Sequence, residues 1–314
     1  KELNNFKKTV WQREPVCVTG FEKNNIDDSE VIINNKSLKL YDFVWNRGHC
    51  QIPDWRKPLY DNNIYQKKRD RRYKYDYNGQ QLYEFFTNAF NNETGISTWG
   101  GHGNDPLFYQ KELMERIADY GYENGKKSTI YIYPEMNNTD KDFGFVMENH
   151  IYPLVEYLET VSSKIAFRAK NVFWQGQVYT KDWEPIVSGK YAFTVIPILE
   201  ETTDKTQELS IAGRMGLWAA GSVDGWGVRC SRDDPSFDRS RQFSSQKLSN
   251  HVLRKTIYSL ACGAKYIHNT VDSQNALLDY HASLAYELLA KEALFVPKRN
   301  EILSFSPVHI SMVR

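Results

Sequence analysis

Eight short runs rich in β-branched and aromatic residues recur along the 314-residue chain, and helix-length amphipathic stretches separate most of them. Runs of this composition suit a pleated, half-buried strand. Strands that alternate with helices predict a parallel sheet, and eight repeats predict an α/β fold, the (β/α)8 or TIM barrel. The runs cover residues 41–48, 96–101, 129–135, 171–177, 191–200, 216–227, 264–270 and 308–313.

The stretches between these runs carry apolar residues at the helical period. Gly121 or Gly125, and Gly263, lie where a helix C-cap favours glycine. Residues 1–40 are expected to form an N-terminal capping segment, and residues 41–314 one barrel domain. The predicted helices cover residues 80–90, 106–125, 145–163, 245–263 and 275–294.

Charge and motifs exclude several classes of partner. Lys plus Arg number 40 and Asp plus Glu 39, so a formal charge of +1 gives no field that would attract nucleic acid. The longest apolar runs are much shorter than the roughly 20 residues that cross a bilayer, which predicts no membrane span. No nucleophile elbow, phosphate loop, H-E-x-x-H or C-x-x-C pattern occurs. We therefore expect no cofactor and no metal. The chain is also expected to act as a monomer.

Aromatic and amide side chains gather at the predicted strand ends. The chain has 8 Trp and 20 Tyr, which offer both an apolar face and a polar edge. A pyranose stacks its C–H face on an indole and needs directional partners for its hydroxyls, so this pattern favours an oligosaccharide or polysaccharide substrate. Alternatively, each Trp caps the barrel core and each amide ties a loop. The candidate binding residues are Trp45, His49, Trp99, His102, Asn104, Tyr133, Asn137, Trp174, Gln175, Gln177, Trp226, His268 and Asn269.

Three carboxylates are candidates for catalysis. Cleaving a glycosidic bond takes two carboxyl groups, about 6.5–9.5 Å apart in an inverting enzyme. Glu135 follows the strand that Pro134 ends, and Asp224 lies in "GSVDGWG"; Asp272 is a third acid. The alternatives are a solvated loop residue for Glu135 and a tight Asp-Gly turn for Asp224. The apolar wall that would raise the pKa of Glu135 is expected from Tyr131 or Tyr133.

Several segments together resemble the catalytic barrel of glycoside hydrolase family 98. They are "STWGGHGNDPLFYQ" (97–110), "IYIYPEMNN" (130–138), "GSVDGWGVRCSRDD" (221–234), "ACGAKYIHNT" (261–270) and "ILSFSPVHISM" (302–312). The resemblance implies an inverting endo-hydrolase of β-1,4-galactosidic or xylosidic bonds. It also implies a secreted or cell-surface bacterial protein, cut here from a longer chain in which a β-rich domain follows the barrel.

By position, the resemblance makes Glu135 the general acid and Asp224 a carboxylate on the base side. One departure is visible, because His268 and Asn269 lie where the family has a late carboxylate. Asp272 is expected to replace it from slightly further on. The main hypothesis is an endo-acting glycosidase. The second is a glycan-binding barrel that has lost its base, and the third is a barrel enzyme acting on another substrate.

Overall fold

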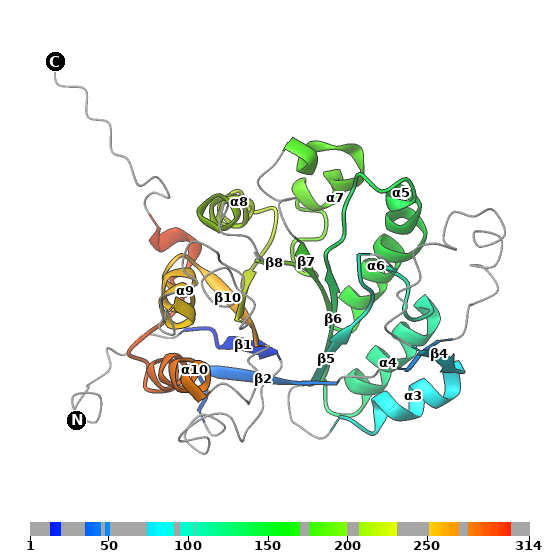
Figure 1. Ribbon diagram of the computed structural model, residues 1–314, viewed down its shortest axis with the longest axis horizontal. Helices are drawn as coiled ribbons and strands as arrows, with labels where there is room; N and C mark the ends of the chain where they lie inside the picture. Colours follow the sequence, from blue (N-terminus) through cyan, green and yellow to red (C-terminus); the bar gives the residue numbers. More distant parts are fainter. Residues whose placement is uncertain are drawn as a thin grey trace.

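The computed structural model describes residues 13–19, 35–44, 48–50, 74–90, 95–103, 105–169, 176–199, 207–230, 251–269 and 276–302. Eight parallel strands close a barrel in the order β1-β10-β9-β8-β7-β6-β5-β2, and helices surround it (Figure 1). The predicted TIM barrel is confirmed. The strands are β1 (Val16–Thr19), β2 (Leu38–Phe43), β5 (Gly95–Trp99), β6 (Ser128–Pro134), β7 (Lys164–Ala169), β8 (Val195–Leu199), β9 (Trp226–Cys230) and β10 (Ala264–Asn269).

The outer layer is helical, as the amphipathic stretches predict. Four short helical segments and a two-stranded sheet, β3 (Gly48–Cys50) with β4 (Lys74–Tyr77), complete the described elements. The short segments are η4 (Met147–Ile151), η6 (Gly176–Tyr179), η7 (Lys181–Trp183) and η8 (Arg299–Glu301). The α-helices are α3 (Gly79–Thr87), α4 (Lys111–Glu123), α5 (Phe143–Val146), α6 (Tyr152–Thr160), α7 (Glu184–Val187), α8 (Gln207–Ala219), α9 (His251–Ala261) and α10 (Ala276–Ala290).

The first strand of the barrel lies in the segment that the sequence assigned to a cap. Val16–Thr19 pairs with β2 on one side and with β10 on the other. All four of its residues are buried, because both faces of a barrel strand are covered. The expected boundary at residue 40 therefore differs from the structure at this strand. The expected strand at 308–313 lies outside the described residues.

Two other strands are displaced along the chain from their predicted positions. The fourth predicted run, 171–177, follows β7 (Lys164–Ala169) instead of coinciding with it, and its last two residues begin η6. The sixth run, 216–227, contains the end of α8 and only the first two residues of β9. The second displacement decides where Asp224 lies.

Successive residues of a strand point to opposite faces of the barrel wall. The strands therefore contribute side chains to two clusters, one inside the barrel and one between the strands and the helices. The interior cluster includes Ile130 and Ile132 of β6 and Ala166 of β7. The alternate residues Tyr131 and Tyr133 belong to the larger cluster between strands and helices. Tyr131 donates a hydrogen bond from its hydroxyl to the carbonyl of Met114 in α4 (2.7 Å), which fixes this outward direction.

Two of the predicted cap glycines have the backbone that favours glycine. Gly125 has φ of +106° and Gly263 has φ of +97°, whereas Gly121 lies within α4. A Cβ on Gly263 would meet the ring of Trp218 at 2.4 Å. No helix in the described part of the chain is both long and apolar enough to span a membrane.

Candidate active site

The inward side chains at the carboxyl end of the strands form a layer of polar and aromatic groups, which we call the mouth layer. It consists of Thr19, Phe43, Trp99, Arg168, Arg229 and His268. Arg168 lies two residues beyond Ala166 of the interior cluster, and Phe43 and Trp99 pack against that cluster. The active sites of TIM barrels are built at this end. The layer is therefore the floor of the candidate site.

Glu135 lies directly beyond β6 at the same end of the barrel. Its φ of +59° is unusual for a residue with a side chain, and such strained positions cluster at functional sites. Its backbone N–H donates to the carbonyl of Arg168 (2.8 Å), which ties it to β7. The carboxylate is 37% exposed and lies 3.6 Å from Nε2 of His102. The expected position of Glu135 at a strand end is thus confirmed.

A glycine-rich loop holds His102 against Glu135. The backbone groups of His102 and Asp105 exchange two hydrogen bonds of 2.7 Å, which close the loop. The His102 ring stacks on Trp99 with ring centroids 5.9 Å apart. Gly103 packs so tightly that an added Cβ would lie 2.1 Å from the carbonyl oxygen of Glu135.

We expect Gly103→Ala to move the loop away from Glu135 and to lower catalytic activity. A Cβ contact below 3 Å with backbone forces a shift, because a backbone atom cannot rotate aside as a flexible side chain does. The control is Gly216→Ala in α8, where an added Cβ meets no atom within 4 Å. That change should be neutral or stabilise by about 0.5–1 kcal/mol through helix propensity. Thermal unfolding and activity of both variants check the prediction. Equal activity of Gly103→Ala and Gly216→Ala would contradict it.

His268 is the buried polar centre of the mouth layer. Its side chain is 0% exposed, and Nδ1 lies 2.7 Å from the hydroxyl oxygen of Thr19. Within the described residues, Nε2 has no hydrogen-bond partner. Burial, followed by the charges of Arg168 and Arg229, lowers the pKa of His268 well below its usual range. The imidazole is therefore neutral at physiological pH.

This pKa shift predicts a loss of stability in acid. His268 binds a proton in the unfolded state below its ordinary pKa of 6.5 but not in the folded state. The free energy of unfolding should therefore fall as the pH drops through 6.5, by up to about 1.4 kcal/mol per pH unit. Denaturant unfolding of wild type and His268→Gln between pH 8 and 5 tests this. The stability of wild type relative to the variant should be constant above pH 7 and decline below it. A constant difference at every pH would refute the assignment.

Asp224 lies at the opposite end of the barrel, which overturns its pairing with Glu135. It precedes β9, which begins at Trp226, whereas Glu135 follows β6. The backbone N–H of Asp224 donates to Ala192, in the turn before β8 (2.9 Å). Its carboxylate is 60% exposed and lies 3.9 Å from Arg299. Asp224 therefore lies in the loop before β9, away from the mouth layer.

Three aromatic candidates do not face the mouth. Trp226 begins β9 and is 0% exposed in the strand–helix core, so it offers no sugar platform. Tyr133 is equally buried, and its hydroxyl lies 3.0 Å from Nε2 of His150 on the helix side. Neither Tyr131 nor Tyr133 therefore forms the expected wall for Glu135. His49 in β3 is 1% exposed and stacks on Phe108, with ring centroids 3.9 Å apart.

Seven further candidates cannot be placed in the site from the described residues. Asp272, Trp45, Asn104, Trp174 and Gln175 lie outside them. Gln177 is part of η6, and Asn269 ends β10. The side chains of these last two are likewise outside the described part. All seven stay predictions.

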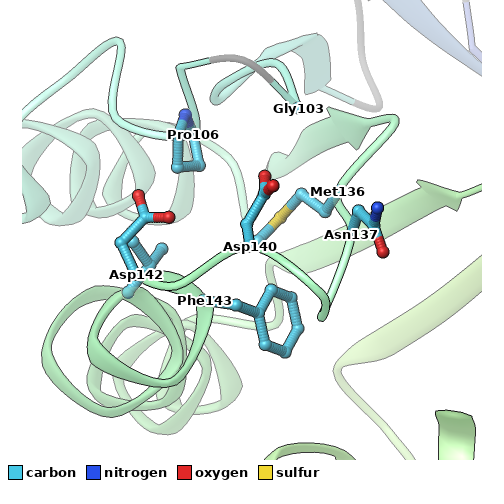
Figure 2. Close-up of a pocket in the computed structure, with 8 residues that line it drawn as sticks. Gly103, Pro106, Met136, Asn137, Asp140, Asp142 and Phe143 are labelled. Atoms are coloured by element: carbon cyan, nitrogen blue, oxygen red, sulfur yellow. The ribbon is translucent and has the colours of Figure 1, made fainter. Parts of the chain in front are cut away.

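A pocket opens beside Glu135, between the loops that follow β5 and β6. Figure 2 shows the Asp140 carboxylate directed toward the Gly103 and Pro106 loop. Asn137 is exposed, and its side-chain oxygen accepts a hydrogen bond from the Thr139 N–H (3.2 Å). The lining residues are Gly103, Pro106, Met136, Asn137, Asp140, Asp142, Phe143 and Val146. In the part of the chain that is described, no group of three or more His, Cys, Asp or Glu could hold a metal ion.

Arg168 and Arg229 are site residues that sequence reasoning missed. Both are nearly buried, at 3% and 8% exposure, and both lie one residue before the last residue of their strand. Arg168 places its guanidinium carbon 5.2 Å from the ring centroid of Trp99. With β7 and β9 at their correct positions, a basic residue one place before the strand end would have indicated both arginines.

Known proteins resemble this chain in sequence and in fold. Residues 54–314 match the model of the lambda-carrageenase middle domain. The chain belongs to this family. The lambda-carrageenase of Pseudoalteromonas carrageenovora is 43% identical over 99% of the chain, and that of a Pseudoalteromonas species is 42% identical over the same share. The chain spans 33% of the length of each of these relatives.

In fold, this member of the lambda-carrageenase middle-domain family resembles the barrel of a family 98 glycoside hydrolase. The catalytic module from Streptococcus pneumoniae TIGR4 aligns with a TM-score of 0.56 at 9% identity. The alignment covers 92% of this chain and 53% of that module, both in its native form and in complex with the LewisY pentasaccharide. The likeness to family 98 that the sequence motifs indicated is confirmed for the fold.

Proposed function

We propose that this chain is the catalytic barrel of an endo-acting, inverting glycoside hydrolase that cleaves β-1,4 linkages inside a polysaccharide. Carrageenan is the first candidate substrate, because the two curated relatives are named lambda-carrageenases. The observation that carries the proposal is the position of Glu135 beside His102 and above the mouth layer. Secretion or attachment to the bacterial surface belongs to the same proposal, since such a polymer is met outside the cell.

In this mechanism Glu135 protonates the oxygen of the leaving sugar. A second carboxylate activates a water molecule on the opposite face of the ring, about 6.5–9.5 Å away. Asp224 does not serve, because it lies at the other end of the barrel. Asp272 is the base that we propose in its place. Trp99 is partly exposed at the end of β5 and supplies a stacking face.

Incubation with lambda-carrageenan, xylan and galactose-containing glycans tests the proposal. New reducing ends should accompany a rapid fall in polymer size, because internal cleavage shortens chains faster than release from the ends. Proton NMR during the first turnovers should show the product anomer inverted relative to the substrate. Release of monosaccharide from intact polymer would contradict endo action, and a retained anomer would contradict inversion.

A non-catalytic glycan-binding barrel is the second candidate. The observation that favours it is the displacement of Asp224, which removes the expected base from the mouth. The same incubation separates the two functions. Tight binding without any reducing ends from any polymer would support the binding module and refute the hydrolase.

A further inference from the structure

The small sheet of β3 and β4 contacts the loop between β5 and α4 at two points. The ring of His49 in β3 stacks on Phe108, with ring centroids 3.9 Å apart. The hydroxyl of Tyr75 in β4 donates a hydrogen bond to a carboxylate oxygen of Asp105 (2.7 Å). This sheet is separate from the barrel, yet the loop that it holds is the one that reaches Glu135.

Asp105 is a carboxylate buried inside this loop, with 0% exposure. One of its oxygens accepts the hydrogen bond from Tyr75, and the other accepts one from the backbone N–H of Leu107 (3.3 Å). A buried carboxylate needs such donors, because its removal from water is costly. Leu107 belongs to the loop itself, whereas Tyr75 comes from outside it. The Tyr75 hydroxyl therefore fixes where the loop lies relative to the rest of the protein.

Asp105 connects Tyr75 to the candidate acid. The backbone of Asp105 exchanges two hydrogen bonds with His102, and Nε2 of His102 lies 3.6 Å from the carboxylate of Glu135. Gly103 lies against the backbone carbonyl of Glu135. A displacement of Asp105 would consequently move both residues that pack on Glu135. Turnover is sensitive to such a movement, because a general acid must lie within hydrogen-bond reach of the leaving oxygen.

We propose that Tyr75 is a positioning residue for the candidate acid: it holds Asp105, and through Asp105 it keeps His102 against Glu135. This inference rests on the proposed function, because it concerns the geometry around the same Glu135. Tyr75 acts through Asp105 and takes no part in the proton transfer. The β3–β4 sheet thereby gains a role in catalysis, although it lies outside the barrel.

Tyr75→Phe removes the hydroxyl and keeps the ring. It should lower kcat on lambda-carrageenan by about ten- to a hundredfold, the effect of a small misplacement, while KM stays nearly unchanged. The matched control is Tyr157→Phe, which breaks the same kind of hydrogen bond, between Tyr157 of α6 and Asp119 of α4 (2.8 Å). The control should keep wild-type kcat. Equal kcat of the two variants at equal folded fraction would overturn the proposal.

A second variant tests the other partner of the same hydrogen bond. Asp105→Asn keeps the shape of the side chain and removes its charge, so it should also lower kcat. Both changes act through one bond, and the double variant should therefore lose little more kcat than the stronger single one. Losses that multiply would show that Tyr75 acts by another route. If Tyr75→Phe does not fold, an unchanged kcat of Asp105→Asn would overturn the proposal.

Proton NMR of the imidazole signals tests the link without turnover. His102→Gln identifies the signals of His102 among those of the 7 histidines. Tyr75→Phe should shift or broaden them, and Tyr157→Phe should leave them as in wild type. Unmoved His102 signals in Tyr75→Phe would overturn the proposal. If wild type cleaves no polymer and the signals still move, the hydrolase is refuted and the hold of Tyr75 on His102 stands.

Discussion

The Glu135→Gln variant is expected to lose at least about a hundredfold in turnover on a natural glycan, the low end of what a general acid contributes. Glutamine keeps the shape and most hydrogen bonding but has no proton to transfer to the leaving oxygen. Substrate affinity and thermal stability should change little, since the carboxylate is 37% exposed and the backbone N–H keeps its bond to Arg168. Reducing-end assays with binding and melting of the same variant measure all three quantities.

Glu148→Gln is the matched control, because Glu148 is exposed on η4 and lies outside the mouth layer. It should retain wild-type turnover. Substrates with an activated leaving group need little protonation, so Glu135→Gln should hydrolyse them with a smaller loss. Near-normal cleavage of the natural glycan by Glu135→Gln would show that this residue is only the polar end of a strand.

Trp226→Ala should lower the free energy of unfolding by about 3–5 kcal/mol, the usual cost of emptying a fully buried aromatic site. Trp226 is 0% exposed between β9 and the helices, so the cavity has no access to solvent and little freedom to collapse. Glycan affinity of the folded fraction should be unchanged. Denaturant unfolding and a binding titration on the same sample measure the two effects.

Trp99→Ala is the comparison that makes this result informative. Trp99 is partly exposed at the end of β5 and contacts His102 and Arg168. It should weaken glycan binding by about 1–3 kcal/mol, by analogy with the stacking of bases on aromatic side chains. If Trp226→Ala weakened binding more than Trp99→Ala at equal folded fraction, the inward and outward assignments of these two rings would be wrong.

The strands found most readily from sequence were those whose residues alternate cleanly. β6 combines inward Ile130 and Ile132 with outward Tyr131 and Tyr133, so both faces are strongly β-forming. β7 was missed because its inward positions carry Lys164 and Arg168 with only Ala166 between them. These residues weaken the apolar signal, so the sequence predicts a strand in the more aromatic run that follows, 171–177.

The position of Asp224 was wrong for a different reason. Gly216 and Gly221 near Trp218 indicated an extended, glycine-rich strand, whereas the structure continues α8 through Ala219. Tertiary packing overrides the poor helix propensity of glycine here. The predicted strand begins at residue 216, whereas β9 begins at Trp226. Asp224 therefore precedes the strand instead of lying near its end, at the opposite end of the barrel from the predicted one. The sequence does not reveal the mouth layer for the same reason, because the position of each strand along the chain decides which side chains point inward.

The closure of the barrel has a consequence for how this protein can be divided. The matched family region begins at residue 54, but β1 and β2 come earlier and join β10 to β5. A fragment restricted to that region would keep six of the eight strands and expose the edges of β5 and β10. Unpaired edges accept strands from other molecules, so such a fragment should aggregate rather than fold as a smaller domain. β1 and β2 therefore cover the edges of β10 and β5 and so prevent this chain from pairing with other copies of itself.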